Sequence, residues 1–216
     1  MNMSNLTKMN RRRGKGSVHV VRPKKKVRGS MNGNTVSLYK SPIEVKYYDT
    51  TVTQYATQGG TLTGLDYPSQ GITSANRIGD SISVRSLECR YTANLTGAST
   101  RDTVRMVLLV DQQGFNTPVP ADIIQPAGLG TAFAPLVPYN YVYRQRFKIL
   151  HEDVFSLTTA FSTYTNRIIL SLNFATTFVG ASTFMNQIYW LILSDEGNPA
   201  QYPLINSAFR VSYTDQ

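Results

Sequence analysis

The chain has 216 residues, enough for one domain or two small ones, and its 22 Lys and Arg residues against 13 Asp and Glu residues give a formal net charge of +9. Its single cysteine, Cys89, excludes an intrachain disulfide and a cysteine-based metal site, and its two histidines, His19 and His151, do not easily supply a Ser-His-Asp triad. No apolar stretch has the length of a signal-peptide core or a membrane span. We therefore expect no metal, no other cofactor, no membrane contact and no catalytic residues.

The positive charge is concentrated at the N-terminus. The first thirty residues hold ten cations and no acid, which leaves 12 basic and 13 acidic residues for positions 31–216. Self-repulsion and glycines oppose folding of this arm, and it contains no aromatic ring to stack on a base. A polycation of this kind favours nucleic acid as its partner, through phosphate contacts that read no sequence; a solvated tail without a ligand is the alternative. The ten cations are Lys8, Arg11, Arg12, Arg13, Lys15, Arg22, Lys24, Lys25, Lys26 and Arg28.

This charge pattern divides the chain into a flexible nucleic-acid-binding arm, residues 1–35, and a folded domain, residues 36–216. Basic clusters in the arm also match the short pattern that host importins read, which predicts nuclear import as a second use of the same charges. The apolar segment Val18–Val21 is long enough only to add a strand to the edge of a sheet. The residues predicted for import are Arg11, Arg12, Arg13, Lys24, Lys25, Lys26 and Arg28.

The folded domain is unusually poor in charge. Its 25 charged residues among positions 31–216 amount to about 13%, roughly half the usual share for a soluble domain. Lysine occurs there only as Lys40, Lys46 and Lys148. A surface rich in Thr, Ser, Asn, Gln and Tyr but poor in Lys and Glu indicates burial against other subunits, and hence a homo-oligomer. An ordinary polar β-domain remains the alternative.

Strand patterns follow one another along the domain. In the segment 81–95 the apolar positions change parity, which predicts a bulge near Arg85 and Ser86 and places Cys89 in the core. Two segments, 103–111 and 186–194, are apolar on both faces, as central or interface strands are. Prolines bracket one short predicted helix, Val119–Gln125. The predicted strands are 43–53, 81–95, 103–111, 143–157, 167–174, 186–194 and 208–213.

Seven or eight strands joined by long loops favour a Greek-key arrangement over an up-and-down barrel. We predict an all-β fold, a single eight-stranded jelly roll of two antiparallel sheets. The loops at 112–142 and near 55–75 are the candidates for outward-facing loops.

Few residues of the domain suggest a ligand site. In the predicted strand 143–157, Arg144, Arg146 and Lys148 form a cationic row at period two, which indicates either inner-wall contacts to nucleic acid or a solvated face. The adjacent acids Glu152-Asp153 and Asp195-Glu196 have the chemistry for calcium between subunits, but chance acidic loops are commoner and we predict no metal site. No complete phosphate-binding loop motif is present.

Several segments resemble, in order, the capsid proteins of circular, Rep-encoding single-stranded DNA viruses. Asn76–Ile82 is similar to the Arg-x-Gly-x-x-Ile segment that opens a strand in that family, and Val104–Gly114 to its Arg-containing apolar strand ending in Asp-x-Gln and a glycine turn. The remaining segments are Pro118 with Asp122–Ile124, Arg146–Leu150 and Asn186–Trp190. Together they cover much of residues 76–194.

The resemblance implies a single jelly roll, about 60 copies of which form a small icosahedral shell with the arms on a single-stranded DNA genome. It further implies location in the virion, and in the host nucleus during assembly. Satellite plant-virus coats share this fold and carry RNA, so RNA stays open. The pair Glu152-Asp153 departs from the single Asp common at this place, and no role is carried over to it.

Two other classes of protein remain in view. A non-viral, sequence-independent nucleic-acid-binding β-domain would bind as tightly without the arm and would carry a basic patch on the domain. An enzyme or lectin with an accessory basic tail would need a cleft with convergent polar groups.

Overall fold

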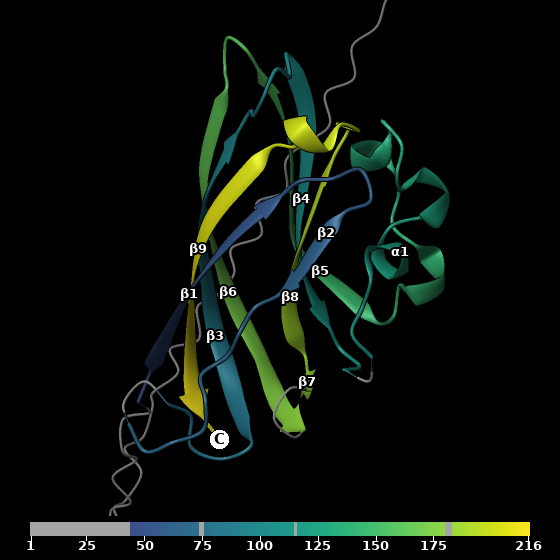
Figure 1. The fold of residues 1–216 in the computed structure, drawn as a ribbon. Helices are drawn as coiled ribbons and strands as arrows, with labels where there is room; N and C mark the ends of the chain where they lie inside the picture. The colour runs from purple at the N-terminus through teal and green to yellow at the C-terminus, as the bar shows by residue number, and fades with distance from the viewer. Residues whose placement is uncertain (1–43, 74–75, 115, 180–182) are drawn as a thin grey trace, which may run out of the picture. The chain divides into compact units, whose positions relative to one another are not determined.

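The computed structural model describes residues 44–216 except 74–75, 115 and 180–182, and within them the chain forms two antiparallel sheets (Figure 1). The expected arm, and the expected boundary after residue 35, lie outside the described residues. Sheet A has the order β1 (Lys46–Tyr55), β9 (Leu204–Asp215), β3 (Ser81–Asn94), β6 (Thr163–Val179) and β7 (Thr183–Met185). Sheet B has the order β2 (Thr61–Gly64), β8 (Gln187–Ser194), β4 (Arg101–Asp111) and β5 (Phe147–Thr158).

The strand order is that of a jelly roll. When the short β7 is set aside, sheet A takes the first, eighth, third and sixth strands along the chain and sheet B the second, seventh, fourth and fifth. Every neighbouring pair in both sheets is antiparallel, and β8 and β9 each pair with strands from the first half of the chain. The predicted all-β jelly-roll fold is confirmed.

The inner faces of the two sheets enclose the main core. Trp190 on β8 is fully buried and meets the ring of Phe209 on β9 edge to face, with centroids 4.7 Å apart. The predicted bulge in β3 is present, since its register with both neighbours shifts between Val84 and Ser86. Cys89 lies in this core as predicted, and burial raises the pKa of its thiol to about 12, so it is unreactive.

A second apolar cluster lies on the outer face of sheet B. The chain between β4 and β5, residues 112–146, packs there as α1 (Pro120–Ile123) and three 3-10 turns, η1 (Pro126–Gly128), η2 (Ala134–Leu136) and η3 (Tyr141–Tyr143); we call this segment the covering loop. In Figure 1 its helical turns lie beside sheet B, on the side away from sheet A. The buried residues that join sheet and loop are Val107, Leu109, Ile123, Ile124, Ala134, Val137, Leu191 and Leu193. This cluster explains why β4 and β8 are apolar on both faces.

Other predicted boundaries differ from the structure. The strand predicted at 143–157 begins only at Phe147, because Tyr141–Tyr143 form a 3-10 turn, and its pairing with β4 skips one residue between Ile149 and His151. The predicted helix is a single turn, and β6 is longer than the predicted 167–174. Strand β2 lies inside the stretch expected to be a loop near 55–75; its four half-buried residues give too short a pattern to recognise.

None of the helices in the described part of the chain is long and apolar enough to span a membrane.

Candidate nucleic-acid interface

The ten cations predicted to bind nucleic acid, and the seven of them predicted for import, all lie outside the described residues. Their roles stay predictions. The described residues instead show where the cations of the folded domain lie.

The three residues predicted as a cationic row do not lie in one row. Arg146 turns into the protein, where its Nε and Nη2 donate to the two carboxylate oxygens of Asp111 at 3.0 and 2.7 Å. Asp111 is 1% exposed and needs a counterion, which fixes Arg146 there. Arg144 follows η3 and stacks on the ring of Tyr141 at 3.9 Å, whereas Lys148 is exposed on β5. Arg146 therefore anchors the ends of the covering loop, and only the other two face solvent.

Arg105 is a second buried arginine under the covering loop. Its Nε lies 2.9 Å from Glu152 Oε1, its Nη1 donates to the carbonyl of Val137, and its guanidinium stacks over the ring of Tyr139 at 4.6 Å. Tyr139 Oη also donates to Glu152 at 2.6 Å, and burial together with that carboxylate raises the pKa of Tyr139 to about 12. Sequence reasoning missed this anchor; the available signal is that Arg105 interrupts the apolar residues of the segment 104–110.

The acidic pairs Glu152-Asp153 and Asp195-Glu196 do not converge on a site for a metal ion. Glu152 faces Arg105 on the outer side of sheet B, whereas Asp153 faces inward and accepts from Tyr91, Tyr164 and Asn166. Asp195 accepts the backbone N–H of Thr103 at 2.6 Å. In the ranges that the structure describes, no group of three or more His, Cys, Asp or Glu residues is arranged to hold a metal.

Asp102 is a buried acid near the start of β4. Its Oδ1 accepts from Ser99 Oγ at 3.1 Å, but its Oδ2 has no hydrogen-bond partner among the described residues. Burial, followed by the nearby carboxylates of Glu196 and Asp195, raises the pKa of Asp102 to about 6, against a weaker opposing effect of Ser99.

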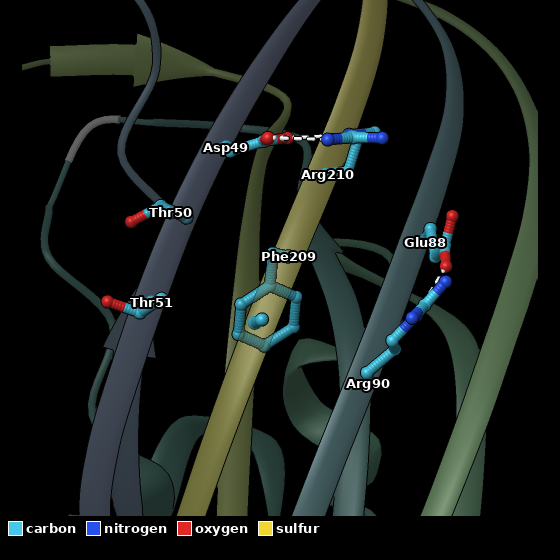
Figure 2. Close-up of a pocket in the computed structure, with 8 residues that line it drawn as sticks. Asp49, Thr50, Thr51, Glu88, Arg90, Phe209 and Arg210 are labelled. Atoms are coloured by element: carbon cyan, nitrogen blue, oxygen red, sulfur yellow. Dashed lines mark hydrogen bonds and ion pairs between the residues drawn. The ribbon is translucent and has the colours of Figure 1, made fainter.

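The outward face of sheet A carries ion pairs, of which one joins β1 to β9 and another joins β3 to β6. Figure 2 shows the Asp49–Arg210 pair and the Glu88–Arg90 pair. Asp49 on β1 accepts two hydrogen bonds from Arg210 on β9, at 2.8 and 2.7 Å. Glu88 on β3 accepts from Arg90 at 2.7 Å and from Arg167 on β6 at 2.8 Å through the same carboxylate oxygen. We call these five residues the arginine face. Hydrogen bonds from the arginines hold the pKa values of Asp49 and Glu88 below their usual range.

The arginine face borders a shallow depression. Thr51, Ala208 and Phe209 line it together with the charged residues Asp49, Glu88, Arg90 and Arg210 (Figure 2). Sequence reasoning missed this site because its members come from four strands and only Glu88 and Arg90 are close in sequence. Alternation with the apolar residues of β3, β6 and β9 is a signal that Glu88, Arg90, Arg167 and Arg210 face outward, but only strand order brings the segments together.

Comparison with known proteins gives little to add. No protein-family model matches the chain, and no curated protein matches it. Among solved structures, a chain titled Desmodium yellow mottle tymovirus is similar, with 11% sequence identity and a TM-score of 0.36 over 87% of this chain and 94% of that one. Because a similarity of this size identifies no family, the fold assignment rests on strand order.

Proposed function

We propose that this chain is a viral coat protein whose jelly-roll domain self-assembles into a small icosahedral shell and whose basic arm packages a single-stranded DNA genome. The observation that carries the proposal is the segregation of charge. Ten unopposed cations precede residue 31, whereas residues 31–216 hold 12 basic and 13 acidic groups. A shell subunit needs this division, because its arm meets a polyanion while its sides meet other subunits.

The arithmetic of packaging is consistent with this role. About 60 arms of charge +10 bring roughly 600 positive charges to a genome with one negative charge per nucleotide. They neutralise part of a small genome and leave the rest to counterions. The choice of single-stranded DNA, of the virion, and of the host nucleus as the assembly site rests on the resemblance of the ordered motifs of residues 76–194. The proposed contact with importins rests on the basic clusters of the arm.

The test is to express the full-length protein without any other viral component and to examine it by size-exclusion chromatography and negative-stain electron microscopy. We expect uniform closed shells, and their ultraviolet absorbance ratio reports whether nucleic acid is inside. A matched variant with the ten arm cations changed to glutamine should retain the folded domain and lose packaged nucleic acid. Monomers or small oligomers that persist across salt and pH would contradict the proposal and would favour a non-viral nucleic-acid-binding domain.

A further inference from the structure

Three exposed arginines form a short diagonal row on the arginine face. The side chains of Arg210, Arg90 and Arg167 are 56%, 64% and 52% exposed. Arg90 lies directly opposite Arg167 in the pairing of β3 with β6, and Arg210 lies opposite Glu88, two residues from Arg90, in the pairing of β9 with β3. Directly opposite residues have Cβ atoms about 5 Å apart and diagonal ones about 7–8 Å apart, so the three arginines project from neighbouring positions on the sheet.

The arginine face contains more arginines than carboxylates. Arg90 and Arg167 share one oxygen of Glu88, and each uses only its Nε for that contact. Among the described residues, the Nη1 and Nη2 atoms of Arg90 and Arg167 have no hydrogen-bond partner. The two terminal nitrogens of each guanidinium are therefore free to donate to another acceptor. A guanidinium fork matches a phosphate group with two parallel hydrogen bonds. With two carboxylates for three arginines, the arginine face has a net charge of +1 and a free binding edge.

The surroundings suit a polar chain lying across the sheet. Uncharged hydroxyl and amide side chains of Thr92, Thr165 and Asn206 border a second depression beside Arg90. At the β1 edge Tyr47 is 59% exposed and lies opposite Ser212, two residues from Arg210, and it offers a ring for an unpaired base. Among the residues that the structure describes, those on the outward face of sheet B form no comparable site, because Arg105 and Arg146 are buried under the covering loop with their own carboxylates.

We propose that the arginine face binds the sugar–phosphate backbone of single-stranded nucleic acid, with Arg90, Arg167 and Arg210 on phosphates and Tyr47 against a base. This rests on the proposed function, in that the packaged genome is the ligand, and it adds a contact on the folded domain to that of the arm. Duplexes are the poorer ligand because their bases are already stacked and paired.

The test measures binding of a fluorescent oligothymidine to dilute full-length protein by anisotropy over a series of salt concentrations. The variant is Arg90→Gln with Arg167→Gln. The matched control is Arg85→Gln with Arg101→Gln, which removes two exposed cations that belong neither to the arginine face nor to the predicted cationic row. Since each phosphate contact to a single strand contributes about 0.7 to the slope of log K against log salt, the face variant should lower the magnitude of that slope by about 1.4. The control should change it by less than half as much.

A second variant tests the direction of the effect. Glu88→Gln removes the carboxylate that competes with phosphate and should tighten oligothymidine binding about threefold or more, as expected for one more favourable charge contact. Weaker or unchanged binding in Glu88→Gln would contradict the proposal, as would an equal slope in the face variant and the control. Photo-crosslinking of a 4-thiothymidine oligomer should also label the peptide that contains Tyr47; labelling confined to the arm would count against the site.

The outcomes separate this proposal from the proposed function. Shells seen by microscopy with no difference between the face variant and the control would leave the coat role and remove the arginine face as a site. A shifted slope without shells would keep the site and remove the coat role. Replacing the oligothymidine with a duplex of equal length should weaken the effect of the face variant; an equal effect would overturn the preference for single strands.

Discussion

The outward faces of the two sheets differ in what covers them. On sheet B the covering loop buries Leu109 and Leu191 completely, whereas on sheet A the corresponding outward positions hold exposed residues such as Thr51, Ala208 and Ile169. An antiparallel sheet with one solvated face alternates apolar and polar residues, and one covered on both faces does not. The difference shows that the apolar pattern of a strand depends on whether the outward face of its sheet is covered. Of the two sheets, sheet A is the one whose outward face is open in the described part of the chain.

The two bidentate ion pairs make the same contrast. In both Arg146–Asp111 and Arg210–Asp49 the closest nitrogen–oxygen distance is 2.7 Å. The side chains of the first pair are 11% and 2% exposed, whereas those of the second pair are 56% and 59% exposed. Removing one partner of a buried pair leaves an unsatisfied charge, whereas an exposed pair is solvated when it is broken. Geometry alone therefore does not predict which pair stabilises the fold.

The largest expected effect tests that contrast. Arg146→Gln should lower the free energy of unfolding by about 3–5 kcal/mol, because Asp111 stays buried without its cation. The matched Arg210→Gln should cost much less, because its pair is exposed and both groups stay solvated when it is broken. Urea denaturation of both variants followed by circular dichroism gives the comparison, and equal losses would mean that burial does not separate the two pairs.

The next effect concerns the apolar cover. Leu109→Ala removes a fully buried side chain between β4 and the covering loop and should cost about 2–4 kcal/mol through lost burial and a cavity. Ile169→Ala, on the outward face of sheet A and 61% exposed, should change stability by no more than about 0.5 kcal/mol. A small loss in Leu109→Ala would show that the covering loop is weakly held. The measurement is the denaturation midpoint of the two variants at constant slope.

A smaller effect of opposite sign is expected at the other end of β4. Asp111 is neutralised by Arg146, but Asp102 is buried without a cation, and burial raises its pKa from 3.8 to about 6. The folded state therefore binds more protons than the unfolded state between about pH 4 and 6, so this residue lowers stability as pH rises through that window. Asp102→Asn should gain about 1–2 kcal/mol at pH 7 and almost nothing at pH 4. Thermal unfolding at both values checks this, and a loss at pH 7 would mean that the ionised carboxylate is stabilised.

The smallest effect serves as the control for binding. Arg90→Gln with Arg167→Gln should change the free energy of unfolding by about 1 kcal/mol or less, since both arginines are more than half exposed. Its thermal midpoint should stay within a few degrees of the parent's, as expected for a change of this size. A large loss would assign these residues a structural role in the fold.

Much of the fold was predictable from local patterns. The bulge in β3 followed from the change of parity between Val84 and Leu87, and the buried position of Cys89 followed from the same pattern. Strand β2 was missed because four half-buried residues give no periodicity. The cationic row from Arg144 to Lys148 was read as one strand face because alternation in sequence does not reveal the 3-10 turn before β5 or the buried carboxylate that holds Arg146.

The sequence by itself determined the segregation of charge, the all-β class and the buried state of Cys89, because these depend on composition and on periods of two along single segments. Only the tertiary structure decided which arginines are paired and buried and which are open to a ligand. Arg105 and Arg146 are enclosed by a loop far from any repeating pattern, whereas Arg90, Arg167 and Arg210 meet only because a jelly roll places β3 between β6 and β9. Long-range strand order brings distant residues together, and no local propensity encodes it.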